Sequence, residues 1–160
     1  MKCRRQAESG TTKWSLWATS ETMIRAPLWL AAFWWVSLSI LGFVVVPLLF
    51  ATLPQAALAG NMAARLFTAQ TWVSCLCALP LLVFSRPDQT FSRIAIAQEV
   101  VVYVVAGLLL ALLTEFAVGP RIVARENLRF WHSLGSAMYV LQWLCAGVAF
   151  WKLSGPKTVA

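Results

Sequence analysis

The feature that most constrains this chain is PLWLAAFWWVSLSILGFVVVPLLFATL, residues 27–53, which contains no charged residue. As an α-helix rising about 1.5 Å per residue, this stretch would be roughly 40 Å long, whereas the hydrocarbon core of a bilayer is about 30 Å thick. Lipid offers the backbone no hydrogen-bond partners, so a spanning segment must satisfy its own backbone groups as a helix. The stretch therefore predicts a transmembrane helix.

Three more apolar runs follow, at about residues 61–84, 96–118 and 131–153. Charged residues make up 12% of the chain, whereas a soluble domain typically has about 25%. Four buried helices of a soluble protein would show polar faces, which these runs lack. Because the connections between the runs are short, neighbouring helices should be antiparallel. We therefore predict an all-α fold, an integral membrane up-down four-helix bundle over residues 27–153.

The basic residues predict the orientation of this bundle through the positive-inside rule. Most of them fall on one side of the predicted membrane: Lys2, Arg4, Arg5, Lys13, Arg25, Arg86, Arg93, Lys152 and Lys157. The other side holds fewer, although three of them share one loop and oppose the rule: Arg65, Arg121, Arg125 and Arg129. We predict a membrane protein with a basic cytoplasmic tail at 1–26 and a short cytoplasmic tail at 154–160. The net charge of +7 then indicates topology and contact with anionic lipids, not nucleic-acid binding.

The sequence lacks the residue sets that catalysis or cofactor binding would need. His132 is the single histidine, whereas a four-helix membrane cytochrome commonly holds haem between paired histidines. Cys75 and Cys77 are two residues apart, so on a helix they point about 200° away from each other and cannot easily share a metal. No serine–histidine–aspartate spacing and no phosphate-binding loop is present. We predict a protein that is not an enzyme and has no cofactor or metal.

Ionisable residues inside or next to the apolar runs are the best functional hint, because charge is costly in lipid. One group falls on the side opposite the tails: Arg65, Glu115, Arg121, Arg125, Arg129 and His132. The three loop arginines are spaced by four, so one helical face would carry all of them. We expect a polar cluster in which Glu115 pairs with an arginine. Such a cluster either fixes the helix order or binds an anion, a proton or a lipid headgroup.

Two prolines fall inside predicted helices, Pro47 in the first and Pro80 in the second. A proline ring removes one helix hydrogen bond and presses on the carbonyl four residues earlier, which for Pro47 is that of Phe43. Neighbouring helices can absorb this distortion in a membrane. We expect fixed helix kinks that improve packing; a hinge in a transport path is the alternative.

Tryptophans occur at two predicted depths. Trp29, Trp131 and Trp151 fall near the predicted membrane surfaces, where aromatic side chains are enriched. A second set falls deeper, and we interpret it as helix-packing or lipid-facing bulk: Trp34, Trp35, Trp72 and Trp143.

Two stretches carry a family resemblance. GFVVVPLLFATLPQAALAGNMAARLFTAQTW has an apolar segment ending in Pro47 and Phe50, and a short loop closing on Ala59 and Gly60, with Phe67 after it. The stretch FAVGPRIVARENLRFWHSLGSAMYVLQW places Phe130 and His132 before a small-residue helix. Together they resemble, over about residues 28–153, the bacterial domain of unknown function 4149, which is similar to the eukaryotic transmembrane protein 205 family. This chain lacks the second histidine of the pattern. The resemblance implies a four-helix integral membrane protein and no specific activity.

These observations favour an accessory or assembly subunit that packs against a larger membrane complex, with lipids and a membrane protein as its partners. A homo-oligomer is an alternative partner arrangement. The alternative function is a small oligomeric transporter or channel that uses Arg65, Glu115 and His132. A haem-containing redox subunit is disfavoured because a single histidine cannot supply paired ligands.

Overall fold

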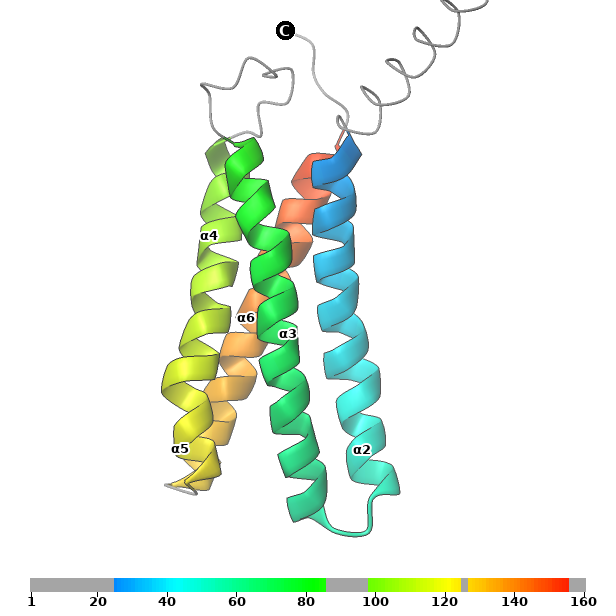
Figure 1. Ribbon diagram of the computed structural model, residues 1–160, viewed down its shortest axis with the longest axis vertical. Coiled ribbons are helices and arrows are strands. Elements are labelled where there is room, and N and C mark those ends of the chain that lie inside the picture. Colours follow the sequence, from blue (N-terminus) through cyan, green and yellow to red (C-terminus); the bar gives the residue numbers. More distant parts are fainter. Residues whose placement is uncertain (1–24, 86–97, 125–126, 156–160) are drawn as a thin grey trace, which may run out of the picture.

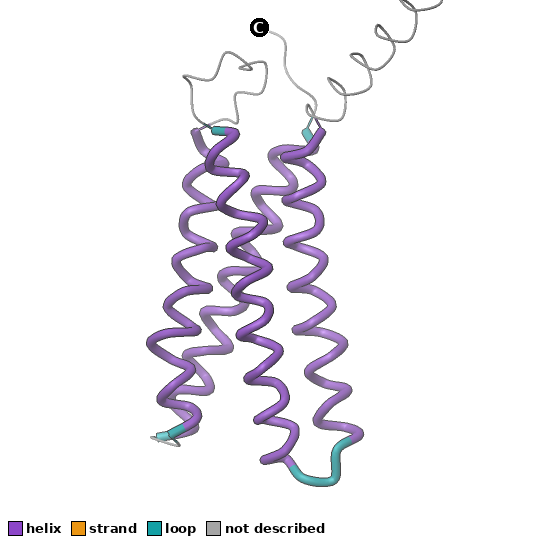
Figure 2. Tube along the Cα trace, viewed as in Figure 1, coloured by secondary structure: helices purple, strands orange, loops and turns teal. Residues whose placement is uncertain are grey.

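The structure is a computed structural model that describes residues 25–85, 98–124 and 127–155. Four helical spans cross the described molecule, and each is long and apolar enough to cross a membrane: Arg25–Thr52, Ala56–Phe84, Gln98–Ile122 and Leu128–Ser154. They pack side by side as antiparallel neighbours (Figure 1), and all regular structure in the described ranges is helical (Figure 2). The predicted all-α, four-helix membrane bundle is confirmed.

The spans are built from α-helices and from short π-helical turns. The first span is α-helical over residues 25–40, then passes through a π-helical turn, η1 (Leu41–Val45), into α2 (Val46–Thr52). The second is the single helix α3 (Ala56–Phe84). The third comprises α4 (Gln98–Leu113), a second π-helical turn η2 (Thr114–Val118) and α5 (Gly119–Val123), and the fourth is α6 (Leu128–Ser154).

Two helices begin earlier than their apolar runs. α3 begins at Ala56 instead of residue 61, because the sequence Ala-Ala-Leu-Ala favours helix, and Gln55 accepts the first backbone hydrogen bonds. α6 begins at Leu128 instead of residue 131, directly after Asn127, whose φ of 39° reverses the chain. The predicted tails beyond Arg25 and Gly155, and Arg86, Arg93 and Arg125 in the loops, lie outside the described residues.

Both π-helical turns end two residues before a proline. η1 ends at Val45 before Pro47, and η2 ends at Val118 before Pro120. In each turn the backbone bond spans five residues, from Val46 to Leu41 and from Gly119 to Thr114. A π turn is one of the ways in which a helix accommodates the missing donor of a proline. Pro47 therefore lies at a local change of hydrogen bonding, whereas Pro80 lies within the continuous helix α3.

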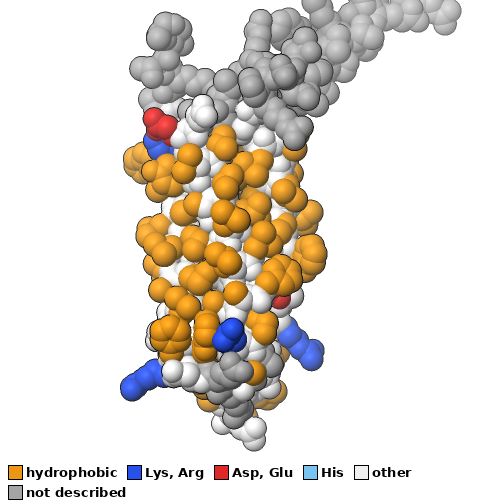
Figure 3. Space-filling view, turned by 90° about the vertical axis from the view of Figure 1, so that its left-hand side faces the viewer, with side chains coloured by type: hydrophobic (Ala, Val, Ile, Leu, Met, Phe, Trp, Pro, Cys, Tyr) orange, Lys and Arg blue, Asp and Glu red, His pale blue; other side chains and the backbone are white. Residues whose placement is uncertain are grey.

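The two ends of the bundle differ. Arg25, Phe84, Gln98 and Ser154 lie at one end, which we call the tail end; Thr52, Ala56, Ile122 and Leu128 lie at the other, the far end (Figure 1). Between them runs a broad apolar band, with charged side chains near its two edges (Figure 3). Large side chains such as Trp72 and Phe116 are 65% and 71% exposed, as expected for residues that face lipid. Which side of the membrane each end faces stays a prediction.

Candidate functional site

Small residues and one tryptophan fill the interior of the bundle. Alanines from all four spans are buried there: Ala31, Ala59, Ala63, Ala78, Ala111, Ala146 and Ala149. Trp34 is fully buried among them. Its indole ring reaches from the first span to Gly107 on α4, where an added Cβ would lie 2.8 Å from the ring. Gly107 thus provides the space that the Trp34 ring occupies at the centre.

A buried polar network surrounds this ring. Gln70, Ser74 and Gln142 are the buried polar side chains among the described residues. The Trp34 indole N–H and the Gln142 side-chain amide both donate to the Ser74 hydroxyl at 3.0 Å. That hydroxyl donates to the backbone carbonyl of Gln70 at 2.9 Å. A serine hydroxyl offers one proton and two lone pairs, so Ser74 is fully satisfied. It joins the first, second and fourth spans.

The network continues to Ser37 of the first span, and a separate hydrogen bond lies beside it at Ser39. The Gln70 amide donates to the Ser37 hydroxyl at 3.0 Å, and Ser37 donates to the Trp34 carbonyl at 2.8 Å. The Trp143 indole N–H donates to the Ser39 hydroxyl at 2.8 Å. These side chains lie close to the middle of their spans, where water is scarce, so the polar groups satisfy one another.

Tyr139 closes the packing between the first and fourth spans. Its phenol hydroxyl donates to the Leu38 carbonyl at 2.7 Å. Its ring packs edge-on against Phe67 of α3, with ring centroids 5.2 Å apart. An added Cβ on Gly42 would lie 2.7 Å from the same ring. One tyrosine therefore holds three spans together, and this arrangement suits a fixed helix register.

The polar cluster expected from the sequence is divided between two depths. Counted from the middle of each span at about 1.5 Å per residue, Arg65 and Glu115 lie about 8 Å towards the far end. On the same scale His132, Arg121 and Arg129 lie about 14–18 Å from the middle, at the edge of a hydrocarbon core about 30 Å thick. Arg125 lies outside the described residues. The expected cluster is therefore divided into a deep pair, Arg65 and Glu115, and an interfacial set, which comprises Arg121, Arg129 and His132.

Glu115 hydrogen-bonds to a threonine, not to the arginine expected from the sequence. The Thr68 hydroxyl of α3 donates to Glu115 Oε1 at 2.8 Å. Side chains on a helix tilt towards its N-terminus. The third span begins at the tail end, so Glu115 tilts towards the membrane middle; α3 begins at the far end, so Arg65 tilts the other way, towards the interface. The Cα–Cβ bonds of the two residues therefore tilt in opposite directions, although their backbones lie at the same depth.

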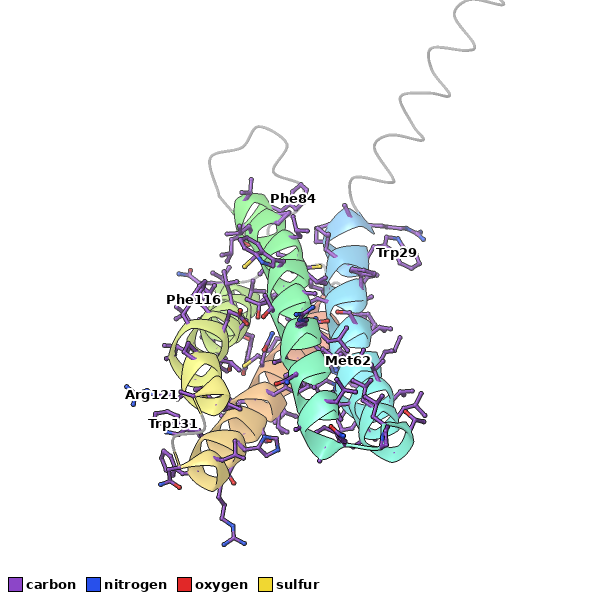
Figure 4. The ribbon with its side chains drawn as sticks, turned by 60° about the horizontal axis from the view of Figure 1, so that its bottom comes forward. Trp29, Met62, Phe84, Phe116, Arg121 and Trp131 are labelled. Carbon is purple, nitrogen blue, oxygen red and sulfur yellow. The ribbon has the colours of Figure 1, made fainter. Side chains whose placement is uncertain are left out.

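The interfacial set lies at the far end. The Arg121 guanidinium lies over the Trp131 ring, 4.7 Å from its centroid, and Figure 4 shows the two side chains together. Arg129 and His132 are exposed at the start of α6. Their backbone carbonyls accept hydrogen bonds from Ser133 and Ser136. The arrangement places Trp131 as an interface anchor with a cation stacked on it.

At the tail end, Lys152 of α6 forms an ion pair with Glu99 of α4. Cys75 is half-buried and Cys77 is buried on α3. In the ranges that the structure describes, no three His, Cys, Asp or Glu side chains come close enough together to hold a metal ion.

The buried network was the feature that sequence reasoning missed. Its signal was present: serines and glutamines inside apolar runs must find partners, because an unsatisfied polar group is costly in lipid. Trp34, Trp35 and Trp143 pack between helices and Trp72 faces outward, as expected from the sequence. The hydrogen bonds that Trp34 and Trp143 donate are the additional feature.

A comparison with protein families gives one match, to the domain of unknown function (DUF4149), over residues 29–130. The matched range contains nearly all of the first span, the next two spans and the start of the fourth. No curated protein and no solved structure matches the chain. Because the match covers more than half of the chain, the protein is a multi-pass membrane protein that belongs to the domain of unknown function 4149 family.

Proposed function

We propose that this protein is a non-catalytic accessory or assembly subunit that packs against a larger complex in the bacterial inner membrane. The observation that supports this role is the closed interior of the bundle. Trp34 fills the centre, and the buried hydroxyl of Ser74 uses its whole hydrogen-bonding capacity inside the chain. A bundle with such an interior offers its outer surface, and not an internal site, for function.

The outer surface supports the same proposal. Along the far half of α3, Asn61, Arg65 and Thr68 are exposed among small residues, and an added Cβ on Gly60 would meet no atom within 4 Å. Small and hydrogen-bonding residues are typical of contact faces between transmembrane helices. A partner helix could therefore approach α3 closely at this end.

The transporter alternative would need polar groups along a path through the membrane. In the described residues the deep charges Arg65 and Glu115 lie towards the outside of the bundle, and the buried polar groups are bonded to one another. A path between copies of the chain would use those outer charges. The oligomeric state therefore separates the two functions.

The test is purification of the chain, tagged and expressed at its native level, in a mild detergent or directly in native lipid discs. We expect one larger membrane protein in fixed stoichiometry across both preparations, measured by quantitative mass spectrometry and by particle mass. Two variants are compared in the same experiment. Trp72→Leu changes an outward face and so tests the outer surface, whereas Ser74→Ala changes the core and so tests the interior. A chain that purifies alone, or as a homo-oligomer, would rule the accessory role out.

A further inference from the structure

We propose that Glu115 is the docking point for a basic side chain carried by a transmembrane helix of the partner protein. This inference rests on the accessory function proposed above and gives its interface a location and a chemistry. The carboxylate lies about 8 Å from the middle of its span, well inside a hydrocarbon core that is about 30 Å thick. It is half-buried, and the Thr68 hydroxyl beside it is exposed on the outside of the bundle.

Among the residues that the structure describes, no basic side chain forms an ion pair with Glu115. Its hydrogen bond comes from a neutral threonine hydroxyl. The ion pair that the described residues form is Lys152–Glu99 at the tail end, about 25 Å away along the span by helix rise. Carboxylates at this depth are normally paired, because an isolated charge in lipid costs several kcal/mol. Charge complementarity therefore calls for a cation from outside the chain.

The surroundings of Glu115 have room for a long side chain. One turn from Thr68 towards the far end stands Ala64 on α3, and one turn from Glu115 in the same direction stands Gly119. An added Cβ on Gly119 would meet a backbone oxygen of its own helix at 3.4 Å and no side chain of another helix. Two small residues thus flank the acidic group on the side of the far-end interface, and the exposed Arg65 is in the same turn of α3 as Ala64. A lysine or arginine of a partner helix fits such a surface.

Two other cation sources fit less well. A second copy of the chain related by a rotation axis along the membrane normal keeps every residue at its own depth. Its Arg65 side chain would again start towards the far end while that of Glu115 starts towards the middle, so the arginine would have to turn back along its helix to reach the carboxylate. A lipid ammonium group lies at the headgroup level, about 7 Å or more beyond the carboxylate. The partner's basic residue must therefore lie within its own apolar segment.

The experiment places a photo-cross-linking amino acid beside Glu115 in the full chain at native expression. Phe116 is 71% exposed and aromatic, so p-benzoylphenylalanine can replace it with its added benzoyl group projecting away from the bundle. Phe33, exposed on the first span, is the control position. We expect Phe116, and not Phe33, to cross-link to an apolar segment that contains a lysine or arginine. A cross-link confined to lipid or to a second copy, or no cross-link at Phe116, would overturn the proposal.

Charge variants then test Glu115 itself. Glu115→Gln keeps an acceptor for Thr68, so the bundle should fold, as size-exclusion chromatography will check. We expect it to weaken the cross-linked complex by a factor of about 30 or more, the smallest loss for removing one partner of a desolvated charge pair. Glu99→Gln, on the same span, should leave the complex unchanged.

Glu115→Lys combined with a glutamate in place of the partner's basic residue should restore the complex, and this readout does not depend on the single variants. If Glu115→Gln, which mimics a neutral carboxyl, retains the complex, the docking proposal is wrong. A stoichiometric partner that still purifies with that variant would leave the accessory function standing. If no partner purifies with the wild-type chain, both the docking proposal and the proposed accessory function are wrong.

Discussion

The indole N–H of Trp34 donates to the hydroxyl of Ser74 at 3.0 Å in the centre of the bundle. The same hydroxyl accepts a second hydrogen bond from Gln142, so one small side chain on α3 holds both the first and the fourth spans. This relationship fixes the rotation of three helices at once. It also makes Ser74 a position where a minimal change should have a large effect on stability.

We predict that Ser74→Ala destabilises the folded bundle by about 1–2 kcal/mol, because two buried donors lose their acceptor in a region without water. Unfolding of the purified chain in mixed micelles, followed by tryptophan fluorescence, measures the free energy. Ser136→Ala is the matched control, since Ser136 is exposed and bonds the carbonyl of His132 on its own helix. Equal effects of the two variants would show that the Ser74 contacts carry no stability.

Two glycines should respond in opposite directions to the same change. An added Cβ on Gly107 would lie 2.8 Å from the buried Trp34 ring, whereas one on Gly60 meets nothing within 4 Å. Gly107→Ala is therefore expected to destabilise the bundle by about 1–2 kcal/mol through overpacking. Gly60→Ala should be neutral or stabilising by up to about 1 kcal/mol, since alanine favours helix. Thermal midpoints in one detergent compare them, and a stable Gly107→Ala variant would argue against a rigid Trp34.

The fold was predictable because a single physical constraint decides it. A run such as residues 27–53 has no alternative in lipid to a helix, and short loops then leave the up-down arrangement. The rotation of each helix was not predictable in the same way. Both the lipid-facing and the buried faces are apolar, so hydrophobicity does not mark the core. Small residues such as Ala78 and Ala146 mark it instead, and such residues occur on outer faces too.

The site was predictable in its residue types but not in its pairings. Glu115 stood out in the sequence because it is charged inside an apolar run, yet its partner depends on which way each helix runs. Thr68 is three residues from Arg65 along α3, and the rotation and alignment of the two helices, which the sequence does not give, bring the threonine to Glu115. The Trp34–Ser74 contact joins residues far apart in the sequence, and no local spacing indicates it.

The ion pair between Lys152 and Glu99 should contribute little to stability. Their side chains are 35% and 72% exposed at the tail end, so solvent and salt screen the attraction. We predict that Lys152→Gln shifts the thermal midpoint less than Ser74→Ala does, and that raising the salt concentration removes the remaining difference from wild type. A shift as large as that of Ser74→Ala, unaffected by salt, would mean that the pair is shielded from water in the native membrane.

The orientation of the bundle gives a last prediction. Gln55 and Gly155 are exposed at opposite ends, so cysteines placed there, in a chain whose own cysteines are alanines, report which end is outside. The positive-inside rule predicts that an impermeant maleimide labels Gln55→Cys in intact cells and Gly155→Cys after permeabilisation. The opposite pattern would show that the far-end arginines outweigh the tail. Arg121→Gln with Arg129→Gln tests their weight: because these charges oppose the predicted orientation, removing them should leave the labelling pattern unchanged, whereas an inversion would identify them as the residues that set it.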